Sequence, residues 1–344
     1  MKSLYAYFGL LDLHEVDSPG HSFYQLGLLD QIKYNFMDDD AQFDFFSYYP
    51  EVLQTGQFPK YPNTALGEVF NRYAASLLNQ YCIPFTNMID AIENREYDTL
   101  FLKARFRNLS TLTKKWKDTH IFETIIEKAL NAGYTKDKIV VLDTDMSLSQ
   151  DFSERYSKYC TIQLANVACS ERFILDCASV HMSSIDDRKT TSVFYGNVDT
   201  SNYKAGNEKS KILTEILVRT TDFSDLSIIV KEGSVPIKSE DIEYIARNNR
   251  SHIWETLENS RIMINVSKDK YDSEKFIPAR VYEALIFGMI PVSYKFEWLC
   301  ETFSFSNELD YIEILKYLIE IDSEDFKKAY KFYINKFIEN VYGT

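Results

Sequence analysis

The chain is poor in residues that break regular structure or crosslink a fold. Its 344 residues include only 11 Gly, 8 Pro and 5 Cys. The cysteines form no CxxC pair and no Cys/His metal-ligand spacing: Cys82, Cys160, Cys169, Cys177 and Cys300. This pattern argues against a disulfide-stapled secreted domain and against a structural zinc site. We expect reduced thiols, as in a cytoplasmic protein.

Positive charge is also scarce. The chain has 38 Lys and Arg against 51 Asp and Glu, a formal net charge of −13. Overall attraction to nucleic acid is therefore absent, and such a partner would need a local basic patch. No apolar run approaches the roughly 20 residues of a membrane span. The first apolar stretch is short and has no small-residue cleavage site after it, so we expect neither a membrane partner nor a signal peptide.

Hydrophobic residues make up 45% of the chain, with 24 Tyr and 24 Phe. This is enough apolar material for about two domains. Strand-like and helix-like segments alternate, which predicts an α/β fold with parallel sheets flanked by helices. The predicted strands are 4–11, 44–49, 99–103, 138–142, 161–165, 192–195, 227–230, 261–266 and 289–294. The predicted helices are 21–33, 67–80, 120–132, 209–218, 251–259, one beginning near Arg280 and ending at Gly288, and 323–341.

Segment 276–292, FIPARVYEALIFGMIPV, is the most informative stretch. It places Arg280 and Glu283 three residues apart at the start of a predicted helix, hence on one helical face. A guanidinium there suits a diphosphate, and a carboxylate one turn later suits a ribose diol. The pair therefore indicates a nucleotide-sugar site. The alternative is an exposed ion pair on an ordinary amphipathic helix.

The buried strand 138–142 is followed by two acidic residues, Asp143 and Asp145. Strand carboxyl ends line the ligand cleft of open α/β sheets, so one of the two is placed for chemistry. A carboxylate there can act as a general base towards an acceptor hydroxyl, or it can bind a metal. The alternative is a turn aspartate that caps the next helix.

A polar loop, 195–211, joins a predicted strand to a predicted helix. Gly196 and Gly206 lie near its two ends, with Asn197 and Lys204 between them and Lys209 at the start of the helix. Such a loop brings backbone N–H groups and a helix N-terminus to a phosphate, although it matches no established phosphate-loop pattern. The alternative is a plain connection. His21, after the first strand, lines the same predicted cleft or serves as a surface or capping residue.

Segment 103–117 reverses the local charge, with six basic residues and no acidic ones. Two aromatic residues lie among the cations, an arrangement that suits a nucleic-acid backbone. The candidate contact residues are Arg105, Phe106, Arg107, Lys114, Lys115, Trp116 and Lys117. The alternative is a solvated loop and helix face.

Taken in order, these pieces resemble the T-even phage DNA β-glucosyltransferase family. Three stretches carry the likeness: 142–152, LDTDMSLSQDF; 194–197, FYGN, with 206–211, GNEKSK; and 276–283, FIPARVYE. The family has a GT-B fold of two Rossmann-like domains. Its members transfer a sugar from a UDP-sugar to 5-hydroxymethylcytosine in duplex DNA.

The resemblance implies residue roles. Asp145 corresponds to the catalytic aspartate, a general base in an inverting displacement. Arg280 and Glu283 hold the diphosphate and ribose, and the uracil lies near Val230 and Gly233. The target base must be flipped out of the duplex. The sugar is glucose or a pentose such as arabinose.

One departure from the family concerns the phosphate loop. The family has arginines there, where this chain has Asp199 and either Asn207 or Glu208. A divalent cation, Mg²⁺ or Mn²⁺, with Asp143 as a candidate ligand, or else Lys204 and Lys209, would compensate for the missing charge.

The resemblance also implies the domain organisation. Residues 1–170 form the acceptor domain and 171–322 the UDP-sugar domain, while 323–344 form a helix that packs back on the first. We expect a monomer in the cytoplasm, of the host if the gene is phage-borne. Two alternatives stay open: a GT-B transferase acting on a glycan or small molecule, which the acidic charge suits, and a non-catalytic binding or partner protein.

Overall fold

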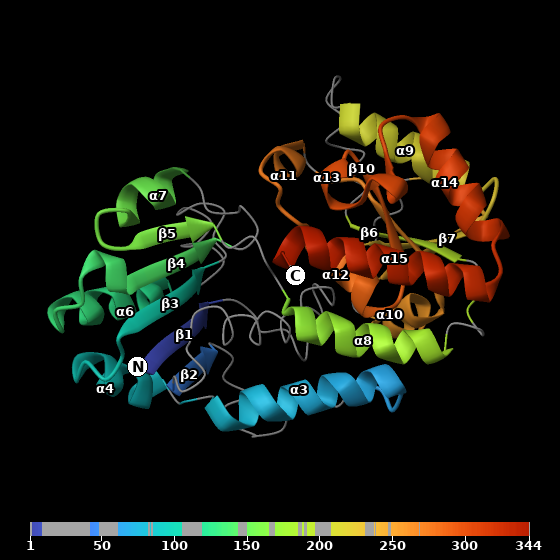
Figure 1. The fold of residues 1–344 in the computed structure, drawn as a ribbon. Coiled ribbons are helices and arrows are strands. Elements are labelled where there is room, and N and C mark those ends of the chain that lie inside the picture. The colour runs from blue at the N-terminus through green and yellow to red at the C-terminus, as the bar shows by residue number, and fades with distance from the viewer. Residues whose placement is uncertain are drawn as a thin grey trace. The chain divides into compact units, whose positions relative to one another are not determined.

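The structure is a computed structural model with two compact units (Figure 1). It describes residues 2–8, 42–47, 61–81, 83, 85–104, 119–143, 150–164, 169–184, 188, 191–196, 208–230, 237, 239–246, 249–267 and 269–343. The described residues up to 164 form the first unit, except for Tyr61–Val69. Those nine residues belong with Cys169 onward, in the second unit.

The first unit is built on a five-stranded parallel sheet in the order β2-β1-β3-β4-β5. Its strands are β1 (Lys2–Phe8), β2 (Gln42–Ser47), β3 (Thr99–Ala104), β4 (Ile139–Asp143) and β5 (Thr161–Leu164). Its helices are α4 (Phe85–Glu93), α6 (Thr119–Asn131), α7 (Gln150–Tyr156) and the part of α3 (Ala65–Tyr81) from Phe70 onward, with a short 3₁₀ turn at Lys136–Lys138. Apolar side chains from both layers meet in the core, for example Leu102 and Val141 with Ile125 and Phe152.

Local sequence explains these elements. Strand β4 is a continuous run of Ile, Val, Val and Leu, buried throughout, as expected for a strand covered on both faces. Helix α6 stops at Gly133, which adopts φ +84°. Beyond it, Tyr134 N donates to Ala129 O at 3.0 Å, and this closes the helix end.

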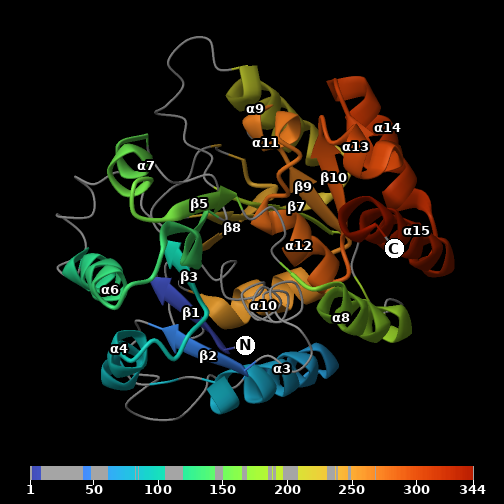
Figure 2. The same cartoon turned by 60° about the vertical axis from the view of Figure 1, so that its left-hand side comes forward.

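The second unit contains a six-stranded parallel sheet in the order β11-β10-β9-β6-β7-β8 (Figure 2). Its strands are β6 (Thr191–Tyr195), β7 (Asp225–Val230), β8 (Ile242–Ala246), β9 (Ile262–Asn265), β10 (Ile290–Tyr294) and β11 (Ser304–Phe305). Its longer helices are α8 (Glu171–Ser184), α9 (Glu208–Thr220), α10 (Arg250–Asn259), α12 (Ala279–Ile286), α14 (Glu308–Glu320) and α15 (Ser323–Tyr342). The short ones are α11 (Asp269–Ser273), α13 (Glu297–Cys300) and a 3₁₀ turn at Glu301–Phe303.

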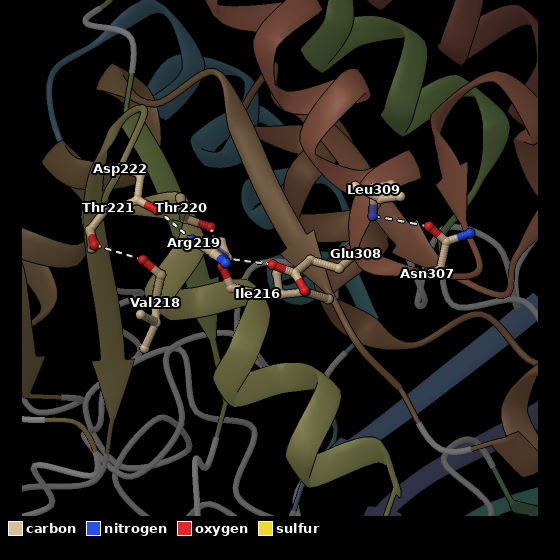
Figure 3. Close-up of polar contacts among 9 residues, drawn as sticks. All are labelled: Ile216, Val218, Arg219, Thr220, Thr221, Asp222, Asn307, Glu308 and Leu309. Atoms are coloured by element: carbon tan, nitrogen blue, oxygen red, sulfur yellow. Dashed lines mark hydrogen bonds and ion pairs between the residues drawn. The ribbon is translucent and has the colours of Figure 1, made fainter.

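Helices α9 and α14 lie side by side and are tied at their ends (Figure 3). Arg219, near the end of α9, pairs with Glu308, the first residue of α14, at 2.7 Å. Asn307 caps α14 by accepting from Leu309 N at 2.9 Å. Below this surface pair, the buried hydroxyls of Thr220 and Tyr311 are 2.6 Å apart.

The observed fold agrees closely with the fold predicted from the sequence. The predicted α/β fold with two parallel sheets is confirmed, and the predicted strands are all present within a few residues. The predicted helix 21–33 lies outside the described residues. Elements not predicted from sequence include α4, α7, α8, β8 and α14.

Helix α15 contacts α8, α13 and β10, and so belongs with the second unit. The units change over between Ala168 and Cys169 and again at 61–69, whereas the sequence expectation had one boundary after residue 170. That the C-terminal helix also packs on the first unit stays a prediction.

Candidate functional site

The second sheet has a switch point between β6 and β9. From β6 the chain proceeds through β7 to β8 on one side, whereas β9, β10 and β11 continue on the other side. Strands β6 and β9 are direct neighbours, with Phe194 opposite Ile264. In open α/β sheets, ligands bind outside the carboxyl ends of the strands at such a point. Here those ends lead into Gly196 and Val266.

Arg280 links the two sides of this switch point. It is the second residue of α12, which starts after Pro278, a residue whose fixed φ suits a helix start. Its Nη1 donates to Val266 O, beyond β9, at 3.4 Å. Its guanidinium carbon lies 5.3 Å from the centre of the Phe194 ring, near the end of β6. The predicted diphosphate-binding arginine therefore lies where the topology predicts a ligand.

Gly196 completes this arrangement. A Cβ at this position would lie 3.3 Å from Arg280 Nη2 and 3.0 Å from Cζ of Phe194. The backbone itself is held, because Gly196 N donates to Ile229 O of β7 at 3.3 Å. The missing side chain lets the guanidinium approach the backbone at the end of β6.

Glu283 follows one turn later on the same helical face. Its side chain is only 2% exposed, and its neighbours on α12 from Val281 to Ile286 are all buried. A surface ion pair on an amphipathic helix would leave such a carboxylate in water. The burial of Glu283 therefore contradicts the alternative of an exposed ion pair on an ordinary amphipathic helix. It places a carboxylate in the interior, where it is retained only with polar partners.

A buried hydrogen-bond chain lies at the same edge. Ser267 Oγ donates to Asn265 Oδ1 at 2.7 Å, and Asn265 Nδ2 donates to Ser293 Oγ of β10 at 3.1 Å. These residues were not singled out from the sequence. The available signals were two polar residues at the end of a buried apolar strand, Asn265 and Ser267, and an aromatic residue two positions before Gly196, Phe194.

The other predicted donor-site residues fall into two groups. Val230 ends β7 at the carboxyl edge and is buried, and Lys209 is the second residue of α9. Four more lie outside the described residues: His21, Asn197, Lys204 and Gly233.

In the first unit, Asp143 is half-buried at the end of β4. Asp145 comes two residues later, outside the described residues. Strand β3 ends at Ala104, next to it in the sheet. The basic segment follows directly and is likewise outside the described residues: Arg105, Phe106, Arg107, Lys114, Lys115, Trp116 and Lys117.

No cluster of three or more His, Cys, Asp or Glu side chains suited to a metal occurs in the part of the chain that the structure describes. Four of the five cysteines are described; none of the four forms a disulfide, and all four are buried. Burial raises the pKa of Cys160 to about 11 and also raises that of Cys300, so neither thiol is activated. No described helix is long and apolar enough to cross a membrane.

A pocket of about 570 Å³ opens at the opposite, amino-terminal edge of the second sheet. It is bounded by the first residues of β6, β7 and β8 and by α10. Five carboxylates line it: Asp225, Glu240, Asp241, Glu243 and Glu255. This negative lining disfavours an anionic ligand in the pocket.

No protein-family model matches the chain, and no curated protein is significantly similar to it in sequence. Among solved structures, the chain is similar to an alpha-glucosyltransferase in complex with UDP-glucose and DNA containing an abasic site. The TM-score is 0.54 at 9% identity, over 98% of this chain and 95% of that one. The fold is GT-B.

Two further solved structures resemble this chain at lower TM-scores. One is a Methanocaldococcus jannaschii UDP-GlcNAc 2-epimerase with UDP-GlcNAc and UDP, at TM-score 0.41 and 8% identity over 96% and 99% of the chains. The other is E. coli ADP-heptose lps heptosyltransferase II, at 0.36 and 9% over 98% and 99%. Scores this low add no argument. At 9% identity, even the first likeness establishes the GT-B fold alone, and activity must be argued from the site.

Proposed function

We propose that the protein is a UDP-sugar-dependent glycosyltransferase. The observation that carries this is the position of Arg280 at the β6/β9 switch point, where it is hydrogen-bonded to Val266 O and lies over the Phe194 ring, close to Gly196. A guanidinium presents a planar set of N–H donors that matches a diphosphate. As the sugar departs, negative charge grows on the UDP oxygens, and a pre-placed cation stabilises that charge.

The rest of the donor site follows the same geometry. Glu283, three residues from Arg280, accepts hydrogen bonds from the ribose hydroxyls. The uracil lies against the backbone after β7, near Val230 and Gly233. Asn197, Lys204, the start of α9 with Lys209, and His21 would contribute the remaining contacts to the phosphates.

The acceptor we propose is 5-hydroxymethylcytosine in duplex DNA. The basic segment 103–117 begins at the end of β3, next to the strand that leads to Asp145, so strand order favours placing both at one sheet edge. Its cations would contact phosphates, and Phe106 or Trp116 would fill the space left by a flipped base. The similar structure that holds UDP-glucose and DNA supports this choice of partners.

The reaction is a single displacement. Asp145 takes the proton of the acceptor hydroxymethyl group while the oxygen of that group bonds to the anomeric carbon. The bond from that carbon to the diphosphate oxygen breaks, and its electron pair leaves with UDP. The sugar is a hexose such as glucose, or a pentose such as arabinose. The configuration at the anomeric carbon inverts.

A second candidate is transfer to a glycan or small molecule. The net charge of −13 favours it, because an acidic protein repels DNA outside its basic segment. Counterion release separates the two candidates, since affinity for a DNA acceptor falls steeply with salt and affinity for a neutral glycan does not.

A mass-spectrometric transfer assay tests the proposal. Duplex DNA containing 5-hydroxymethylcytosine is incubated with a panel of UDP-sugars and with wild type, Asp145→Asn or the neighbouring Asp143→Asn. A sugar mass on the base, lost with Asp145→Asn and kept with Asp143→Asn, supports the proposal. Loss with Asp143→Asn alone moves the base to that residue. NMR of the product reports the anomeric configuration, and retention would overturn the single displacement.

A further inference from the structure

The last turn of α12 is held by three buried side chains from distant parts of the second unit. Each donates a hydrogen bond to a main-chain carbonyl at the helix end, and together we term them the α12 clamp: His181, Arg188 and Tyr330. His181 Nε2 lies 2.6 Å from Ile286 O, and Tyr330 Oη lies 2.6 Å from Leu285 O. Arg188 Nη1 lies 2.9 Å from Gly288 O.

The hydrogen bonds fix the state of His181. Arg188 is only a donor, so His181 Nδ1 accepts from Arg188 Nη2 and Nε2 carries the proton given to Ile286 O. Burial, and then the Arg188 charge, lower the pKa of His181 to about 3. The imidazole is therefore neutral near pH 7 and locked in one tautomer.

Arg188 is a buried cation placed at the ends of two helices. Its Nη1 also donates to Ser260 O at 3.1 Å, and Ser260 is the C-cap of α10. Gly288 is the residue after the C-cap of α12. Helix C-termini carry partial negative charge, so two of them converge on this guanidinium and offset its burial. Burial lowers its pKa only to about 10, which leaves it charged at neutral pH.

Gly288 makes the clamp possible. It has φ +72°, and a Cβ there would lie 2.5 Å from His181 Cγ and 2.7 Å from Arg188 Nη2. The helix ends in a motif in which Met289 N donates to Ala284 O and Gly288 N to Leu285 O. Ile286 O and Gly288 O accept from His181 and Arg188, and Leu285 O accepts from Tyr330 in addition to Gly288 N.

We propose that the α12 clamp positions Arg280 and Glu283 for binding the nucleotide donor. Helix α12 has only eight residues, so fixing its last turn fixes the rotation and axial position of its first turn. In some proteins, buried polar groups are retained because they select one arrangement of the packed elements. The proposal deepens the nucleotide-binding function given above and rests on it.

The test compares two matched deletions of one hydroxyl. Tyr330 and Tyr311 are both fully buried, and each makes a hydrogen bond of 2.6 Å, but Tyr311 pairs with Thr220 away from α12. The dissociation constant for UDP and the thermal midpoint are measured for Tyr330→Phe and Tyr311→Phe. Loss of one hydrogen bond corresponds to about 2- to 13-fold in an equilibrium constant. We expect Tyr330→Phe to weaken UDP binding by about that factor and Tyr311→Phe to leave it unchanged, while both lower the midpoint.

A double-mutant cycle separates positioning from simple loss of stability. Arg280→Lys keeps the charge and loses the planar fork. If the clamp acts through Arg280, adding Tyr330→Phe to Arg280→Lys weakens UDP binding less than it does in wild type. His181→Asn, which keeps an acceptor for Arg188 and loses the donor to Ile286 O, replaces Tyr330→Phe if that variant does not fold.

Three outcomes overturn the inference. Equal effects of Tyr330→Phe and Tyr311→Phe on UDP binding would make the clamp a stability device only. Full additivity with Arg280→Lys would mean that it does not act through Arg280. A wild-type protein with no UDP binding would overturn the proposed function together with the inference, which distinguishes that failure from the first two.

Discussion

The guanidinium of Arg280 lies over the ring of Phe194, with 5.3 Å between Cζ and the ring centre. Phe194 is 1% exposed, so its ring is a fixed surface rather than a mobile side chain. At this distance the guanidinium is attracted electrostatically by the face of the ring, which helps to fix its position. A cation positioned in this way needs little reorganisation when negative charge develops nearby.

Gly196→Ala should impair UDP binding more than folding. Its added Cβ would lie 3.0 Å from Phe194 and 3.3 Å from Arg280 Nη2, so one of the two must shift by a few tenths of an ångström. We expect the affinity for UDP to fall by about tenfold, the effect of roughly 1.4 kcal/mol. Calorimetric titration with UDP and a thermal melt measure the two effects. An unchanged dissociation constant would show that Gly196 does not shape the site.

Gly288→Ala should destabilise the protein far more than Gly343→Ala. The two glycines have nearly the same φ, +72° and +74°, so both substitutions carry the left-handed backbone cost of about 1–2 kcal/mol. A Cβ at Gly288 also collides with His181 and Arg188, whereas none of the described atoms lies within 4 Å of one at Gly343. We expect a loss of about 4 kcal/mol or more at Gly288. Equal losses in denaturant titrations would contradict the packing at the end of α12.

Acid should destabilise the second unit through His181. Its pKa is about 3 in the fold and near 6.5 when unfolded, so between these values the unfolded chain binds the extra proton. The contribution of His181 to the free energy of unfolding is therefore fully present above about pH 6.5. It declines as the pH falls towards 3, by about 2 kcal/mol between pH 7 and pH 5. Denaturation followed by tryptophan fluorescence measures this slope. His181→Asn should flatten it, and the same slope in His181→Asn would contradict the assignment; exposed His252→Gln serves as the control.

Charge reversal in the basic segment should weaken DNA binding and its dependence on salt. With Lys114, Lys115 and Lys117 changed to Glu, three phosphate contacts are lost and the log–log salt slope falls by about 2.7. A matched triple on α15, Lys328→Glu, Lys331→Glu and Lys336→Glu, makes the same change in net charge. Fluorescence anisotropy with labelled duplex compares the two. Equal slopes would show that the segment makes no phosphate contacts.

Much of the fold could be predicted because local signals agreed with the global arrangement. The run 139–142 is apolar throughout and forms the buried strand β4. Gly133 and Gly288 both end helices with positive φ, as their positions after apolar periodic segments suggested. The spacing of Arg280 and Glu283 correctly predicted that both lie on one helix, whereas the burial of Glu283 was not predicted.

Two helices, α8 and α14, were not predicted although the sequence contains a signal for each. Helix α8 buries Phe173, Ile174, Cys177, Ala178 and His181, which follow helical spacing. Its Cys, Ser and Met residues obscure that pattern on inspection. Helix α14 was also missed, although Asn307 is a strong capping residue and Tyr311, Leu315 and Leu318 repeat at helical intervals.

The contacts that build the site could not be predicted from any local signal. Phe194, Val266 and Arg280 come from three separate parts of the chain. The contacts of the α12 clamp join residues 45, 100 and 105 positions apart. Such contacts depend on strand order and register, which sequence spacing does not encode. Because the strands are parallel, the acidic pocket at their first residues and Arg280 beyond their last residues lie at opposite ends of the sheet.

The most direct test of the central claim is titration of the wild type and Arg280→Lys with UDP and with uridine. The account predicts that the wild type prefers UDP and that Arg280→Lys weakens UDP binding by about 10- to 100-fold, since bonds to charged groups contribute roughly 1.5–3 kcal/mol. Uridine binding should not change. Arg219→Lys, at the exposed Glu308 pair, is the control and should bind both ligands as the wild type does. Equal UDP affinity of the wild type and Arg280→Lys would contradict the claim that Arg280 holds the diphosphate.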